Sequence, residues 1–157
     1  MLVVAIVVGV NLLSPHRTET LSGSYSFDVT DPQLVAGYAD VVVIGRVEAA
    51  HDTVSDPIIA TKFQVTVVEV ILGKAEPSET FLQYGGTSGK VTWVMEDQEP
   101  LTPGQTYVLA AGRGKHGYQV VGGPVAVQRL DTDNDITKAT TTWRDHVANR
   151  KTPDFAR

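Results

Sequence analysis

Positive charge gathers at Arg113, Lys115 and His116, within a glycine-flanked turn of a chain whose formal net charge is −5. Cationic side chains on an exposed turn can bind the acidic groups of a partner. Tyr84 and Trp93 flank a second glycine-rich segment, and exposed aromatic rings add apolar contact area to such a surface. We therefore take all five as candidate binding residues. The simpler alternatives are a solvated hairpin tip and two core aromatics.

The segment 85–90, which reads GGTSGK, resembles part of a phosphate-binding loop. That motif requires a glycine five residues before the Gly-Lys pair and Ser or Thr after the lysine. Tyr84 and Val91 occupy these positions, and the residues that follow favour a strand rather than a helix. We interpret the segment as a flexible connection between strands.

Asp131, Asp133 and Asp135 alternate like the first ligands of a calcium-binding loop. However, Ile136 stands where that loop needs glycine, and Thr142 stands where it needs a bidentate glutamate. Carboxylates also stabilise the N-terminus of a helix, where backbone N–H groups point outward. The acidic run therefore predicts a helix cap rather than a metal site.

Catalytic motifs are missing from the sequence. The 4 histidines lie far apart, the chain has 0 cysteines, and no Gly-x-Ser-x-Gly elbow occurs. We therefore predict no catalytic residues, no bound metal, no cofactor and no enzymatic activity. An enzyme whose site assembles from residues distant in the sequence remains as an alternative.

The N-terminal residues 1–13, MLVVAIVVGVNLL, are almost entirely apolar. As a helix they would cover ~20 Å, less than the ~30 Å hydrocarbon core of a bilayer. This length suits the apolar part of a secretory signal or a short anchor, although no Lys or Arg precedes it and no small-x-small cleavage site follows. We expect an extracytoplasmic protein, secreted or anchored by these residues. The alternative is a buried N-terminal strand.

Short alternating segments dominate the chain after a polar linker at 14–30. Residues 61–72 alternate apolar with polar side chains, and residues 40–50 are rich in β-branched residues with Gly45 in their middle. Glycine inside a strand often marks a bend in a curved sheet. Together with turn signals every ~8–12 residues, this pattern predicts a mainly β fold, a small barrel or sandwich.

The C-terminal part changes period. Ile136, Ala139, Trp143 and Val147 recur at helical spacing and predict an amphipathic helix that packs through Trp143. We therefore expect one domain over residues 31–150, followed by a frayed tail at 151–157.

The order of these segments resembles the netrin-like modules, known from the tissue inhibitors of metalloproteinases. The similar stretches are 39–47 (ADVVVIGRV), 63–74 (FQVTVVEVILGK), 101–112 (LTPGQTYVLAAG) and 117–123, so that the resemblance spans about 38–130. It implies an OB-like Greek-key β-barrel with a flanking C-terminal helix. The family's inhibitors insert an N-terminal cysteine into a protease's zinc site, and this chain has no cysteine to carry over.

The function we expect is that of a non-enzymatic binding module that contacts a protein or another cell-envelope partner. The net charge of −5 disfavours nucleic acid as that partner, because an acidic protein repels the phosphate backbone. The N-terminal segment would supply any contact with a membrane. The alternative is a protease inhibitor of the netrin-like type that acts without a cysteine.

Overall fold

The computed structural model describes residues 15–55 and 57–156, so the predicted signal or anchor at 1–13 lies outside it. The fold is mainly β, as the sequence predicts, and its largest sheet is six-stranded. Those strands are β2 (Val41–Ser55), β3 (Ile59–Leu72), β4 (Ser78–Tyr84), β7 (Thr106–Gly114), β8 (Gly117–Val120) and β9 (Val127–Leu130).

The sheet closes into an OB-like Greek-key barrel, which confirms the predicted fold class. β2, β3 and β4 pair antiparallel in sequence order, β4 runs parallel to β8, and β8 pairs antiparallel with β7. β7 then returns to β2, with Val41 opposite Ala111 and Arg46 opposite Thr106. The register between β2 and β3 shifts between Ile44 and Gly45, which is the bend that the glycine predicts.

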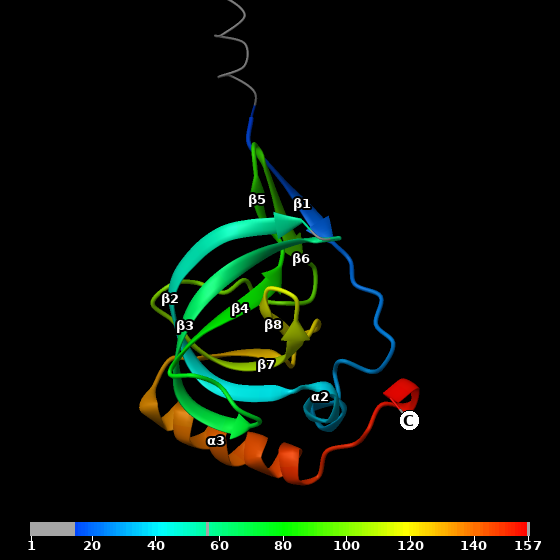
Figure 1. The fold of residues 1–157 in the computed structure, drawn as a ribbon, viewed down its shortest axis with the longest axis vertical. Coiled ribbons are helices and arrows are strands. Elements are labelled where there is room, and N and C mark those ends of the chain that lie inside the picture. The colour runs from blue at the N-terminus through cyan, green and yellow to red at the C-terminus, as the bar shows by residue number, and fades with distance from the viewer. Residues whose placement is uncertain (1–14, 56, 157) are drawn as a thin grey trace, which may run out of the picture.

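A 3-stranded second sheet forms a stalk on the barrel (Figure 1). It consists of β1 (Arg17–Leu21), β5 (Gly86–Ser88) and β6 (Val91–Met95). β1 lies parallel to β6, and its two ends are fixed by the hydrogen bonds Arg17 N to Lys90 O and Glu96 N to Leu21 O, each 3.0 Å. The polar linker expected at 14–30 therefore contains a strand, and the glycine-rich connection at 85–90 contains another.

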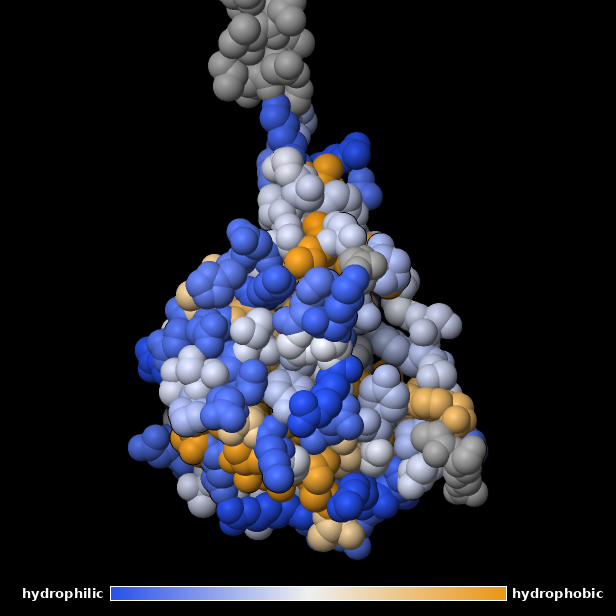
Figure 2. Space-filling model, viewed as in Figure 1, coloured by the Kyte–Doolittle hydropathy of each residue, from blue (hydrophilic) through white to orange (hydrophobic). Residues whose placement is uncertain are grey.

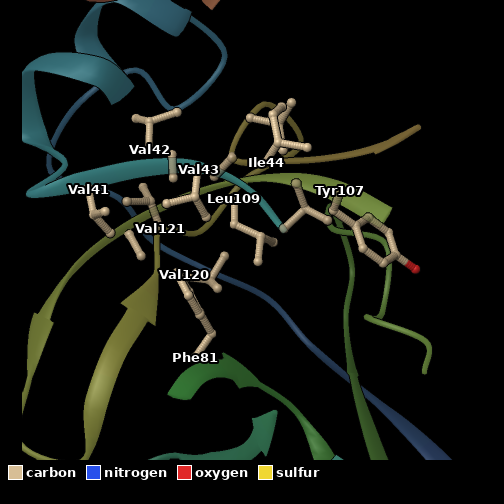
Figure 3. Packing of buried hydrophobic residues seen from close by; sticks show 14 of the residues in the cluster. Val41, Val42, Val43, Ile44, Phe81, Tyr107, Leu109, Val120 and Val121 are labelled. Carbon is tan, nitrogen blue, oxygen red and sulfur yellow. The ribbon is translucent and has the colours of Figure 1, made fainter. Parts of the chain in front are cut away.

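The first strand of the barrel is buried on both of its faces. Val41 and Val43 point toward Leu109 and Phe81 in the barrel interior, while Val42 points to the opposite side, toward α2 (Pro32–Tyr38) (Figure 3). All of these side chains are fully buried. This double burial explains why 41–44 is a continuous apolar run instead of an alternating one.

The C-terminal helix α3 (Asp133–Ala148) is present where the sequence predicts it. Thr132 and Asp135 form a reciprocal capping box at its N-terminus, so this part of the acidic run caps a helix as expected. The hydrogen bonds from Thr132 hold the pKa of the Asp135 carboxyl below its ordinary value. Further along the helix, Trp143 is fully buried, and Arg144 forms an ion pair with Glu69 of β3.

The C-terminal tail is packed where we expected it to fray. Lys151 donates its backbone N–H to the carbonyl of Gln33 at 3.0 Å, and its ammonium contacts Asp31 at 2.9 Å. A short 3₁₀ helix, η1 (Asp154–Ala156), then brings Phe155 against the rings of Phe27 and Tyr38. These contacts bind the tail to α2 and to the residues that precede α2 in the sequence.

The outer surface has an exposed apolar region at the end of β3, over which hydrophobic residues gather in Figure 2. Its most exposed members are Val68 and Val70. Among the described residues, no helix is long and apolar enough to cross a membrane.

Candidate functional site

The stalk is joined to α2 by an irregular segment, residues 22–29, which we call the strap. It runs down the outside of the barrel (Figure 1). Within the described residues, no backbone–backbone hydrogen bond joins residues 22–27 to the barrel. Side chains hold this part instead: the Ser22 hydroxyl donates to Glu96 at 2.9 Å, and the Tyr25 hydroxyl donates to Asp97 at 3.0 Å.

The strap packs on two adjacent glycines. A Cβ atom at Gly122 would overlap the ring of Tyr25, and a Cβ atom at Gly123 would overlap the side chain of Val29. Gly123 also has a φ of 89°, a conformation that favours glycine. We call Gly122 and Gly123 the glycine seat, because the strap's side chains fill the space that larger residues there would need.

The phenol of Tyr25 has an unusual environment. Burial and, after it, the hydrogen bond to Asp97 raise the pKa of Tyr25 from 10.0 to about 12. Both effects disfavour the phenolate, because the charged form would lose water and would face a carboxylate. The protonated phenol is therefore the form that holds the strap.

We expect this pKa to be visible in an absorbance titration of the phenols, as the difference between the wild type and Tyr25→Phe. Because the folded pKa is raised, the phenol's contribution to strap binding is fully present below pH 10.0 and is lost as the pH rises through about 12. Asp97→Asn should lower the midpoint but leave it above 10.0, since burial remains. A midpoint near 10.0 in the folded wild type would show that Tyr25 is not seated.

A cavity of about 580 Å³ lies between the strap and the barrel. Tyr25 and Gly122 line one side of it, and Ile58, Tyr84 and Met95 are further apolar wall residues. A smaller pocket of about 80 Å³ adjoins it through four shared wall residues, Ile58, Tyr84, Gly114 and Gln119. We call the cavity and this pocket together the cleft.

The cleft brings together most of the binding residues that the sequence predicts. Tyr84 borders both of its parts, Arg113 borders the larger one, and Lys115 and His116 border the smaller one. Trp93 instead lines a third pocket of about 140 Å³, which shares the wall residues Tyr84 and Met95 with the larger cavity. Trp93 itself lines neither part of the cleft.

The β7–β8 hairpin that carries the cationic residues is held at its base. The backbone N–H of Arg113 donates to the Asp40 carboxylate at 2.7 Å, and its guanidinium lies 5.5 Å from the centre of the Tyr118 ring. A cation over an aromatic face is a favourable contact that also limits where the charge can move. These contacts hold the base of the hairpin and restrict the charge of Arg113.

Sequence reasoning missed the strap's contribution to the cleft. We interpreted residues 14–30 as a linker and assigned no role in binding to the Gly122-Gly123 pair. The available signal was the alternation of small residues with Tyr25 and Phe27, followed much later by the Gly122-Gly123 pair. Nothing in the local pattern says that these two segments meet.

No protein-family model and no curated protein sequence matches this chain. The resemblance to the netrin-like modules therefore stays a prediction. Within residues 15–55 and 57–156, no group of three or more His, Cys, Asp or Glu side chains is arranged to hold a metal ion.

Proposed function

We propose that the protein is an exported or membrane-tethered binding module without enzymatic activity, and that its cleft contacts a protein or another cell-envelope partner. The observation that carries this proposal is the position of the cleft. It lies beside the tip of the β2–β3 hairpin and the β7–β8 hairpin, at Ile58 and at 113–117. OB-like barrels commonly bind their ligands at the equivalent pair of loops and the adjoining strand face.

The chemistry of the cleft suits a partner segment that is both apolar and acidic. Ile58, Tyr84 and Met95 offer apolar surface, whereas Arg113 brings positive charge to the larger part and Lys115 to the smaller part. In a chain of net charge −5, a local cationic rim favours the approach of an acidic group and its orientation at the site. A mostly apolar hollow with a few convergent polar groups is the usual form of a binding site.

The tether in this proposal is the apolar run at 1–13. The described chain begins with the stalk, at the end of the molecule opposite α3 (Figure 1). The strap follows directly, so the segment that connects the predicted anchor to the barrel is also a wall of the cleft.

Site-specific photo-crosslinking in cells tests the proposal. A photoreactive amino acid at Ile58, which is 46% exposed beside the cleft, should capture a discrete partner. The same amino acid at Val68 is the matched control, because Val68 is 59% exposed on β3 and lines no part of the cleft. Adding Arg113→Glu and Lys115→Glu to the Ile58 variant should weaken capture about tenfold, equivalent to about 1.4 kcal/mol.

Capture at Val68 that equals capture at Ile58, or charge reversal without effect, would reject the cleft as the contact site. Fractionation of the same cells tests the tether. The full chain should be recovered outside the cytoplasm or with the membrane, and deletion of residues 1–13 should abolish this location. Recovery of the full chain in the cytoplasm would reject export.

A further inference from the structure

The strap occupies the glycine seat in the manner of a bound peptide. Its conformation is irregular, and within the described residues no backbone–backbone hydrogen bond joins 22–27 to the barrel. Single side chains that enter complementary positions hold it instead. The ring of Tyr25 lies against Gly122, and its hydroxyl reaches Asp97 at 3.0 Å. Such an arrangement binds a segment through its side chains rather than through its backbone.

We propose that the glycine seat is an exchangeable docking site for an extended partner segment that carries a tyrosine between small residues, and that Tyr25 of the strap competes for it from within the chain. This inference deepens the proposed function and rests on it, because it names the class of segment that the partner offers.

The seat has the features that select a tyrosine. The missing Cβ atoms of Gly122 and Gly123 leave room for a flat ring close to the backbone. Asp97 accepts the hydrogen bond of the phenol, and this is the group that separates tyrosine from phenylalanine. A site built to bind a substrate hydroxyl discriminates against the analogue that lacks it, because the site's own polar group is then left without its partner.

The strap can leave the seat without disturbing the barrel. Its opening exposes the buried Val29, separates Tyr25 from Gly122, and breaks the hydrogen bonds that the Ser22 and Tyr25 hydroxyls donate. The ladders that close the barrel stay intact. Segments with few buried contacts and few backbone hydrogen bonds open at a small fraction of the global free energy of unfolding. The partner's entry route also exists, because Tyr25 and Gly122 line the same 580 Å³ cavity as the cleft residues Tyr84 and Arg113.

Competition within one chain sets the expected size of the effect. A tethered segment has an effective concentration on the order of millimolar, so the intact strap weakens the binding of a competing segment. Replacing Tyr25 by a small residue empties the seat and removes that competition. Binding of an added tyrosine peptide should therefore improve in the variant, although the variant has lost an aromatic side chain.

The experiment uses the full chain and a fluorescent peptide with the strap's own sequence, residues 21–29 (LSGSYSFDV). Fluorescence anisotropy should show that Tyr25→Ala binds this peptide at least tenfold more tightly than the wild type does. A control peptide with the tyrosine replaced by alanine should not bind. Adding Gly122→Ala to the Tyr25→Ala variant should abolish binding, because the new Cβ fills the seat, and Asp97→Asn should weaken it about fivefold.

Equal binding of the peptide to the wild type and to Tyr25→Ala, or no binding to either, would overturn the inference. Circular dichroism establishes that each variant is folded, and Tyr25→Ser replaces Tyr25→Ala if the latter does not fold. If neither folds, Tyr25 is a structural residue and the inference is overturned. Crosslinking at Ile58 without peptide binding would reject the glycine seat as a docking site and keep the proposed function. Peptide binding without crosslinking would reject the proposed cellular function and keep the glycine seat as a docking site.

Discussion

Replacing Trp143 by alanine should lower the free energy of unfolding by about 3–5 kcal/mol, the range for a large aromatic side chain removed from a core. Trp143 is 0% exposed and is the largest fully buried side chain of the described residues. Its indole N–H donates to Gln128 of β9 at 3.0 Å, and its ring makes an edge contact with His146 at 5.5 Å. The substitution therefore leaves a cavity and also removes a partly buried hydrogen bond.

Urea denaturation followed by circular dichroism measures this loss. Trp143→Phe is the matched control, because it keeps a buried aromatic ring. It removes the indole hydrogen bond and part of the side-chain volume. We expect it to cost about 1–2 kcal/mol. A loss below 1 kcal/mol for Trp143→Ala would mean that α3 does not share a core with the barrel.

The role of Trp143 is visible in the sequence because helical periodicity is a local signal. Four apolar residues at helical spacing place Trp143 in the middle of one face, and a large aromatic in that position has to be buried. The start of the helix is also set by a local signal, namely Thr132 and the acidic residues that follow it. The same holds for the barrel, whose strands and central bend follow from alternation and from Gly45.

The pairing of β1 with β6 shows what local patterns do not contain. Arg17 lies beside Val91, and no periodicity in either segment indicates that they meet. A parallel edge strand of charged and hydroxyl residues has none of the apolar alternation that identifies a half-buried strand. We consequently interpreted it as linker.

The candidate site was predicted in part, for the same physical reason. The charge of the hairpin at 113–116 and the aromatic at Tyr84 are properties of single residues, and the closed barrel brings them to one cleft. The glycine seat is instead a property of a contact between segments about a hundred positions apart. Only the fold reveals that Gly122 is small because Tyr25 lies on it.

The exposed valines on β3 are a weaker candidate binding site than the cleft. Val68 and Val70 are exposed and line no part of the cleft, whereas the cleft combines a hollow, apolar walls and a cationic rim. Specific recognition needs both kinds of contact. This contrast is the reason why Val68 serves as the control position for crosslinking rather than as a second candidate site.

The polar interior beneath the seat leads to the second large effect. Gln83 of β4 is 4% exposed, and its amide makes three hydrogen bonds: to Gln98 Oε1 at 3.0 Å, to Glu99 O at 2.8 Å, and from Leu101 N at 2.8 Å. Gln98 is 7% exposed and donates in turn to the carbonyls of Val121 and Gly123, both at 2.8 Å. These two amides therefore join the barrel wall to the segment that carries the glycine seat.

Gln83→Met should lower the free energy of unfolding by about 3 kcal/mol, because methionine fills the volume but leaves the Leu101 N–H and the Glu99 carbonyl without their partner. The matched control is Gln64→Met on the neighbouring strand, where the side chain is only half-buried and bonds the Ser78 hydroxyl at the surface. We expect that variant to stay within about 0.5 kcal/mol of the wild type. Urea denaturation measures both values, and equal losses would mean that the buried amides do not act as a network.

The same variant tests whether the network supports the seat. Gln98 loses its neighbour in Gln83→Met, so its hold on the Gly123 carbonyl weakens and the strap should bind less tightly. Because burial is the main reason why the pKa of Tyr25 lies at about 12, a loosened strap should bring that pKa down toward 10.0 in the folded protein. Gln64→Met should leave it unchanged. An unaltered Tyr25 titration in folded Gln83→Met would show that the strap depends on Asp97 and the glycines alone.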